Sequence, residues 1–370
     1  MFATVVTFLV VLSVLVFVHE LGHFLVARKM GMKVEEFGFG FPPRAWGVKR
    51  GDTTYSVNWI PIGGFVRIKG ENGVGRGDPD SFAAKGKAAR FAVLIAGVAM
   101  NVLAAMVLLG VGFMVGMPAV LSDDLPASAR VRDAHIRIVS VYPDSPAARA
   151  GVEPGDALVS LDGQVFERDV DARAFVAEQG EEGVNAVFRA ADGETLREAH
   201  LTVEDLGDTG RRGLGIGLVT TGTVSLPPHR ALVQGVVSGA TLTIDVARAF
   251  GGMFRSLVME RRVSVDLSGP VGIAVMTGDA AALGAGSLLQ FMAVLSANLA
   301  IVNLLPFPAL DGGRILFVLV EAVRRKPADE RVEAVAHNIG FLLLMALILL
   351  VTFRDFAQFG GRMLAGLTGG

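Results

Sequence analysis

Residues 1–27 read MFATVVTFLVVLSVLVFVHELGHFLVA, an apolar run that holds the pentapeptide His19-Glu20-Leu21-Gly22-His23 near its end. Residues 2–18 carry no charge. A helix that continues to Ala27 has about 26 residues and, at ~1.5 Å per residue, can cross a hydrocarbon core of ~30 Å. We therefore predict that residues 1–28 form a first transmembrane helix, which carries the pentapeptide within the membrane.

The pentapeptide places two imidazoles on one face of this helix. His19 and His23 are four residues apart, so both can reach one metal ion. Glu20 lies beside them and could take a proton from a water at that metal. The pattern H-E-x-x-H on a helix is typical of zinc metalloproteases, and only six His occur in the chain. Because a catalytic zinc usually has three protein ligands, a third must come from elsewhere.

Asp311 is the favoured candidate for the third ligand. It follows Pro306 and Pro308, which are expected to interrupt a third apolar segment. An acid at a break in a membrane helix indicates a functional site, since an unpaired charge in hydrocarbon is costly. The alternative ligand is His337, at the start of the last apolar segment. Asp311 could also be an ordinary turn residue of Asp-Gly-Gly.

Charge placement predicts the topology. No Lys or Arg precedes the first apolar segment, whereas Arg28, Lys29 and Lys33 follow it at once. The positive-inside rule then puts the N-terminus outside and the pentapeptide toward the cytoplasmic end of its span. Three further segments are expected to span: residues 91–117, 283–322 and 334–353. Four spans leave both termini outside.

The stretches between the spans differ in composition. Residues 29–90 are basic and, from Val34 to Lys69, rich in Gly, aromatic and β-branched residues, which predicts a membrane-associated β element on the cytoplasmic side or an ordinary solvated hairpin. Residues 122–222 hold ten Arg and nineteen Asp or Glu, and predict a compact α+β domain outside the membrane. Residues 230–282 predict an amphipathic membrane-associated segment, or a helix packed on the protein.

Composition excludes several classes of protein. Apolar residues make up 52% of the 370 residues and charged residues 19%, which is typical of a membrane protein with a soluble part. A net charge of −2 does not suggest attraction of the whole protein to nucleic acid. The chain contains no Cys, so neither a disulfide nor a thiolate ligand can form. The first segment has no basic n-region or small-residue cleavage site, and we interpret it as a retained anchor.

Together these residues resemble the site-2 protease family of intramembrane zinc metalloproteases, in its bacterial regulator of sigma-E protease type. The resemblance rests on four stretches: residues 18–24, 61–66, 267–274 and 303–313. It implies that His19, His23 and Asp311 bind Zn²⁺ and that Glu20 is the catalytic base. It also implies that residues 34–69 present the substrate as an extended strand.

The resemblance implies a substrate-binding role for Asn298 and Asn303. By residue type alone these amides could equally form hydrogen bonds between helices. The acidic domain resembles a single bacterial-type PDZ domain over residues 145–163. Residues 213–216, Gly-Leu-Gly-Ile, could supply the edge that docks a peptide.

The implied function is regulated intramembrane proteolysis in the bacterial cytoplasmic (inner) membrane. The implied substrates are single-span membrane proteins already trimmed outside, such as anti-sigma factors and remnant signal peptides. Membrane lipid is the other expected partner, nucleic acid is not, and the oligomeric state is left open. A catalytically silent PDZ-containing scaffold or regulator is the rival hypothesis. A metal transporter is disfavoured, because the second and fourth spans offer almost no polar residues.

Overall fold

Among the residues that the structure describes, four helices are long and apolar enough to cross a membrane. The structure is a computed structural model that describes residues 2–71, 75, 77–121, 126, 128–180, 183–190, 193–206, 212–259, 269–326 and 329–368. The four candidate spans are Phe2–Lys29, Lys87–Val115, Ala285–Leu304 and Arg331–Ala357. The prediction of four membrane helices is thus confirmed.

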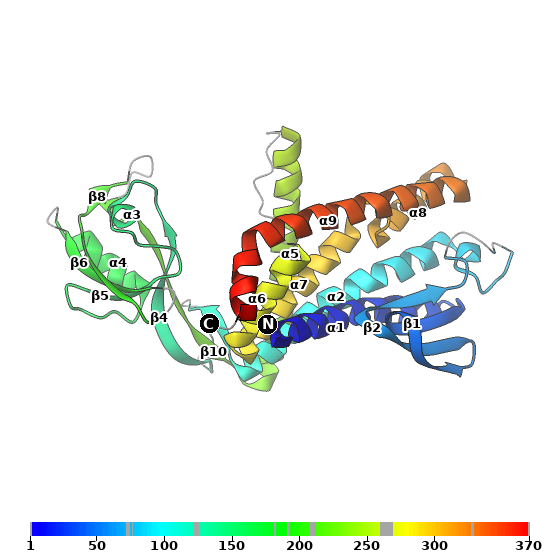
Figure 1. The fold of residues 1–370 in the computed structure, drawn as a ribbon, viewed down its shortest axis with the longest axis horizontal. Coiled ribbons are helices and arrows are strands. Elements are labelled where there is room, and N and C mark those ends of the chain that lie inside the picture. Colours follow the sequence, from blue (N-terminus) through cyan, green and yellow to red (C-terminus); the bar gives the residue numbers. More distant parts are fainter. Residues whose placement is uncertain are drawn as a thin grey trace. The chain divides into compact units, whose positions relative to one another are not determined.

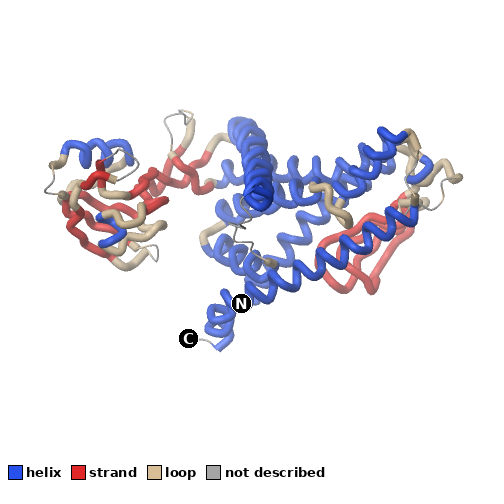
Figure 2. The backbone as a smooth tube through the Cα atoms, turned by 90° about the horizontal axis from the view of Figure 1, so that it is seen from above, coloured by secondary structure: helices blue, strands red, loops and turns tan. Residues whose placement is uncertain are grey.

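The chain divides into two compact units, which we describe one at a time (Figure 1). Unit 1 contains residues 1–112 and 229–370, and unit 2 contains residues 113–228. The helices of unit 1 are α1 (Phe2–Lys29), η1 (Phe82–Ala84), α2 (Lys87–Val115), α5 (Pro228–Met259), α6 (Pro270–Ala282), α7 (Ala285–Leu304), α8 (Asp311–Arg324) and α9 (Glu330–Thr368). Its strands are β1 (Val34–Arg50) and β2 (Thr53–Ile68), which lie against the helices (Figure 2).

Helices α1 and α2 approach each other closely through small residues. A Cβ added at Gly22 of α1 would lie 2.4 Å from the carbonyl oxygen of Ala96 on α2, so only glycine fits there. Dispersion and close backbone packing of this kind drive helix association where no hydrophobic effect operates between helices. The contact brings the pentapeptide face of α1 directly against α2.

The β element consists of two long strands, β1 with 17 residues and β2 with 16. The first half of β1 pairs on both sides, since Phe37 faces Tyr55 from the start of β2 and Val66 from its end. Residues 64–68 of β2 therefore form an edge of this small sheet. The hydroxyl of Ser13 in α1 donates to the carbonyl of Pro61 at 2.9 Å and accepts from the amide of Gly63 at 3.2 Å. These bonds attach the turn before that edge to the first membrane helix.

The third apolar segment is interrupted, as the two prolines predict. Helix α7 ends at Leu304 and α8 begins at Asp311. A Cβ at Gly312 would lie 2.1 Å from the carbonyl oxygen of Leu305, and one at Gly313 would lie 2.4 Å from that of Phe307. The two glycines thus let the first turn of α8 fold back onto the linking turn, with Asp311 at the start of the helix.

The described part of residues 230–282 forms two helices, α5 up to Met259 and α6 from Pro270, and the association of this segment with the membrane stays a prediction. Gly235 of α5 packs against Gly110 of α2, where an added Cβ would meet the Gly110 Cα at 2.5 Å. Helix α6 packs on α1, where the corresponding contact joins Gly278 to Thr4 at 2.5 Å. Both helices are therefore packed on the protein, through glycines that a hydrophobicity pattern does not distinguish. Leu267 and Ser268, part of the third motif, lie outside the described residues.

Unit 2 is built on an antiparallel sheet with strand order β3-β10-β4-β5-β6-β7. Its elements are β3 (Met117–Val120), β4 (Arg130–Val141), α3 (Pro146–Arg149), β5 (Ala157–Leu161), α4 (Asp169–Glu178), β6 (Val184–Arg189), β7 (Leu196–Leu201), β8 (Glu204–Asp205), β9 (Arg212–Gly213) and β10 (Ile216–Ser225). Apolar side chains such as Ile136, Leu161 and Phe188 form its core. The expectation of an α+β unit in this region agrees with these elements.

Candidate metal centre

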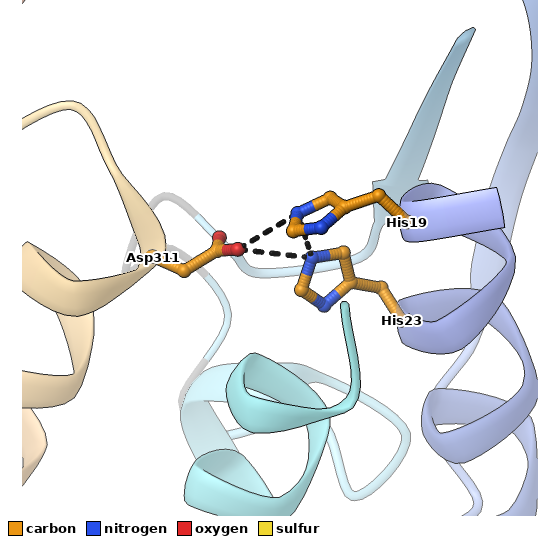
Figure 3. Close-up of side chains that lie close together, drawn as sticks. All are labelled: His19, His23 and Asp311. Carbon is orange, nitrogen blue, oxygen red and sulfur yellow. Dashed lines mark hydrogen bonds and ion pairs between the residues drawn. The ribbon is translucent and has the colours of Figure 1, made fainter. Parts of the chain in front are cut away.

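Three side chains from two distant parts of the chain converge on one point in unit 1 (Figure 3). His19 Nε2 lies 3.0 Å and His23 Nε2 lies 3.2 Å from Oδ2 of Asp311. The two Nε2 atoms are 3.2 Å apart. Both imidazoles are buried, and Asp311 is partly buried. Helix α1 supplies the two histidines one turn apart, and the start of α8 supplies the carboxylate.

The outward-facing nitrogens of both rings are directed at α2. His23 Nδ1 donates to the carbonyl oxygen of Val93 at 2.8 Å, which leaves Nε2 of a neutral ring with a free lone pair. His19 Nδ1 faces the side-chain amide of Asn101. Both rings thus point Nε2 at Asp311, as a shared metal would require.

The donor set and its spacing fit a zinc ion. Two imidazole nitrogens and one carboxylate oxygen form one of the ligand sets found in zinc hydrolases, with a fourth position left for solvent or substrate. In a tetrahedral site with bonds of ~2.0–2.1 Å, neighbouring ligand atoms are about 3.3 Å apart. The observed separations of 3.0 to 3.2 Å are close to that value. A cation between these atoms would bind the lone pairs of the two buried nitrogens and of the carboxylate oxygen, which otherwise face one another at close range.

Glu20 borders the ligand cluster and contacts the β element. Its Oε2 accepts a hydrogen bond of 3.0 Å from the amide of Val66, on the edge of β2. Glu20, His23 and Asp311 together line a cavity of about 180 Å³, which residues of β2, of α2 and of the turn before α8 also line. A carboxylate beside three side chains that could hold a metal ion, at one small cavity, can support metal-assisted hydrolysis.

The structure gives the other predicted residues different positions. His337, the alternative ligand, accepts through Nδ1 from the amide of Ala309 at 2.9 Å and so holds the turn before Asp311. The amide of Asn298 donates to the Val294 carbonyl of its own helix at 2.8 Å, and Asn303 is half-buried in the last turn of α7. Residues 213–216 line a separate cavity of about 330 Å³ in unit 2.

Comparison with known proteins decides the family. The model of peptidase family M50 matches residues 7–347. The chain belongs to peptidase family M50. It is a zinc metalloprotease with membrane helices.

Relatives of this M50 protease match over almost its whole length. A Clostridium perfringens protein named as a zinc metalloprotease is 36% identical, and the match covers 94% of this chain and 96% of that protein. The regulator of sigma-W protease RasP of Bacillus subtilis is 30% identical over 95% of this chain and 98% of its own. Among solved structures, the PDZ domain of an SdrC-like protein from Listeria monocytogenes aligns with 24% of this chain and with 92% of its own length. The identity is 22% and the TM-score is 0.22.

Sequence reasoning missed the contribution of α2 to the site. Val93, Gly97 and Asn101 all face the histidines, and a Cβ at Gly97 would lie 2.4 Å from His23 Nε2. One signal was present: Asn101 is the only polar side chain between Phe91 and Val115. The backbone carbonyl of Val93 and the absent side chain of Gly97 could not be identified in this way, because neither depends on a distinctive residue type.

Proposed function

We propose that this M50 protease hydrolyses peptide bonds within or next to the transmembrane segment of single-span membrane proteins. The observation that carries the proposal is the position of His19, Glu20 and His23 on α1, a helix apolar enough to cross a membrane. A site at that depth faces membrane-embedded peptide rather than soluble substrate. The proposed location is the bacterial cytoplasmic membrane, with both termini outside and the site toward the cytoplasm.

In this proposal His19, His23 and Asp311 hold the zinc. When bound, zinc polarises the scissile carbonyl and makes water a stronger acid. Glu20 accepts the proton from the attacking water and later delivers it to the nitrogen of the leaving amine. Because Oε2 of Glu20 already accepts from the Val66 amide, that bond fixes the carboxylate while Oε1 can take the proton.

The proposed reaction requires an extended substrate. In a transmembrane helix every backbone carbonyl accepts a hydrogen bond from within the helix, so the segment must unwind before its scissile carbonyl can be attacked. Residues 64–68 form the edge of the sheet at the cavity beside Glu20 and could pair with the unwound segment. We assign the amides of Asn298 and Asn303 to the same task, as hydrogen-bond partners for substrate backbone.

The proposed substrates are proteins already trimmed outside the membrane, such as anti-sigma factors and remnant signal peptides. The name of the Bacillus subtilis relative, a regulator of sigma-W protease, supports the first class. Unit 2 would act as the PDZ-like part that controls access. Its 330 Å³ cavity runs along Gly213–Leu218, where the strand β10 begins, and could receive the new end of a trimmed substrate.

Replacement of the proposed base tests this function. Glu20→Gln keeps the size of the side chain but cannot accept the proton, so we expect intact zinc binding and loss of cleavage of a reporter transmembrane segment. The matched control is Glu35→Gln, the same change at an exposed residue of β1, which should cleave normally. Cleavage by Glu20→Gln at the wild-type rate would rule out this mechanism. A wild-type chain that binds zinc and trimmed proteins but cleaves none would instead indicate the scaffold function.

A further inference from the structure

Asn101 is a fully buried amide in the middle of an apolar membrane helix. Its residue is 0% exposed, and no other polar side chain lies between Phe91 and Val115 of α2. A polar group in that position is costly unless it is hydrogen-bonded. Its side-chain nitrogen Nδ2 lies 3.2 Å from Nδ1 of His19. Among the described residues, its oxygen Oδ1 is one of three buried side-chain atoms that lack a hydrogen-bond partner.

The chemistry of a zinc ligand requires the opposite orientation of this amide. If His19 binds zinc through Nε2, its Nδ1 carries the ring proton and must donate. The Nδ2 group of an amide is itself a donor and cannot accept that proton. Rotation of the amide by half a turn exchanges its nitrogen and oxygen, whose assignment rests on the hydrogen-bond network. The rotated Oδ1 accepts from His19 and gains the donor that it otherwise lacks.

Helix α2 also supplies a hydrogen-bond acceptor for His23. The carbonyl of Val93 accepts from Nδ1 of His23 at 2.8 Å. Residues 93, 97 and 101 are successive members of an i, i+4, i+8 series and so share one face of α2. Between the two acceptors lies Gly97, where a Cβ would come within 2.4 Å of His23 Nε2 and 2.7 Å of His19 Cε1. This face supplies an acceptor for each ring and the space for both.

We infer that Asn101 is a positioning residue of the metal centre, which accepts the Nδ1 proton of His19 and thereby directs Nε2 at the zinc. The inference rests on the proposed ligand role of His19. It assigns Asn101 no contact with substrate or with the reacting atoms. Acceptors in the outer shell of a zinc site typically change metal affinity by about 10–100-fold when they are removed.

Asn101 also takes part in helix packing, but through its backbone and not through its side chain. The link between α2 and α7 uses the main chain, because the hydroxyl of Ser296 donates to the backbone carbonyl of Asn101 at 2.8 Å. Removal of the side-chain amide leaves that bond in place. Ser296→Ala removes it while leaving the amide intact, and is therefore the matched control for helix packing.

The test measures zinc affinity in the purified full-length protein by competition with a chelator of known affinity. Asn101→Leu keeps the volume but removes the acceptor, and we expect zinc to bind about 10–100-fold more weakly. Asn101→Asp retains an acceptor and should restore affinity to within a few-fold of the wild type. Ser296→Ala should bind zinc as the wild type does. Elution as a single folded species and an unchanged helical circular dichroism spectrum are required of each variant.

Several outcomes would overturn the inference. Wild-type affinity in Asn101→Leu would show that His19 needs no acceptor there. Equal weakening in Asn101→Asp and Asn101→Leu would show that the NH₂ group, not the oxygen, is what matters. If Asn101→Asp does not fold, the comparison of Asn101→Leu with wild type still decides, and the visible spectrum of the cobalt(II) form reports independently on the ligand geometry.

A further variant separates this inference from the ligand assignment itself. His19→Ala should lose zinc if His19 is a ligand. Retention of zinc in His19→Ala would reject the ligand role and with it the proposed mechanism. Loss of zinc in His19→Ala, together with unchanged affinity in Asn101→Leu, would reject the role of Asn101 alone.

Discussion

At the scale of single residues, the ligand cluster depends on a carboxylate that stands 292 positions from the first histidine along the chain. Asp311 Oδ2 is the atom on which both Nε2 atoms converge, at 3.0 and 3.2 Å. It is held there by the turn before α8, which His337 secures through the amide of Ala309. Asp311 therefore faces the two histidines, whereas His337 holds the turn that carries Asp311.

Substitution of Asp311 should remove zinc, whereas substitution of His337 should not. Asp311→Asn replaces the proposed anionic ligand by a neutral amide of the same size, which binds zinc poorly. We expect the zinc content by elemental analysis to fall well below one per chain. His337→Gln is the control and should retain zinc, because its side-chain oxygen can still accept from the amide of Ala309. The reverse pattern would make His337 the third ligand.

Glu36 predicts a pH dependence of stability in the β element. Burial of its carboxylate opposes ionisation, but hydrogen bonds from Ser56 at 2.8 Å and Arg44 at 2.6 Å outweigh this and hold the pKa of Glu36 below its ordinary 4.5. The folded protein thus favours the ionised form more than the unfolded chain does. The resulting stability is present above pH 4.5 and is lost as the pH falls through the lower folded pKa.

This pH dependence can be measured by thermal unfolding in detergent. The wild type should lose more stability than Glu36→Gln when the pH is lowered from above 4.5 to below it, and the two should converge in acid. Glu35→Gln, at the exposed neighbouring residue, should follow the wild type throughout. Parallel curves for Glu36→Gln and the wild type would contradict the assignment.

At the scale of elements, the start of α6 depends on a buried carboxylate from α9. Asp355 is 2% exposed, and its two oxygens accept from the amides of Gly269 at 3.1 Å and Gly272 at 2.7 Å. These amides are among those that a helix leaves unpaired at its N-terminus, where a negative charge is also favourable. Because α6 packs on α1, this cap supports the helix that carries the histidines.

Loss of the cap should destabilise the membrane unit. Asp355→Asn leaves one oxygen and directs an NH₂ group at a backbone donor, with an expected cost of about 1–2 kcal/mol. A lower midpoint of thermal unfolding is the measurable result. Asp279→Asn, the same change at an exposed residue of α6, should leave the midpoint unchanged. Equal midpoints for Asp355→Asn and the wild type would show that other contacts hold the start of α6.

At the scale of the whole molecule, the orientation of the chain in the membrane decides which compartment each unit faces. The proposed topology puts unit 2 outside and the β element on the cytoplasmic side. The charge pattern supports it, since residues 28–90 hold twelve Lys or Arg against six Asp or Glu. Net positive loops are retained in the cytoplasm, so this stretch should face inward.

The absence of Cys makes the topology directly measurable. Gly180→Cys places one thiol on an exposed position of unit 2, and Lys49→Cys places one on an exposed position of β1. In intact cells a membrane-impermeant maleimide should label Gly180→Cys at once. Lys49→Cys should react only after the membrane is permeabilised. The opposite labelling would invert the topology and move the proposed site to the outer half of the membrane.

Much of the architecture could be predicted because it depends on local patterns. Apolar runs long enough to span a bilayer identified the four membrane helices, and Pro306 and Pro308 located the break before Asp311. The i, i+4 spacing placed His19 and His23 on one face. The double pairing of Phe37 was not predictable, because strand register depends on partners distant in the chain. The contacts of α5 and α6 also depend on distant partners, and the sequence left open whether this segment packs on the protein or lies on the membrane.

The sequence by itself determined which residues are chemically able to bind a metal and which segments are apolar enough to enter a membrane, since both follow from residue type and period. The tertiary structure alone decided that one face of α2 holds the two rings, with the Val93 carbonyl, the gap at Gly97 and the Asn101 amide. That decision depends on how closely two helix backbones approach. Close approach is set by the glycines that meet in space, not by any pattern along the chain.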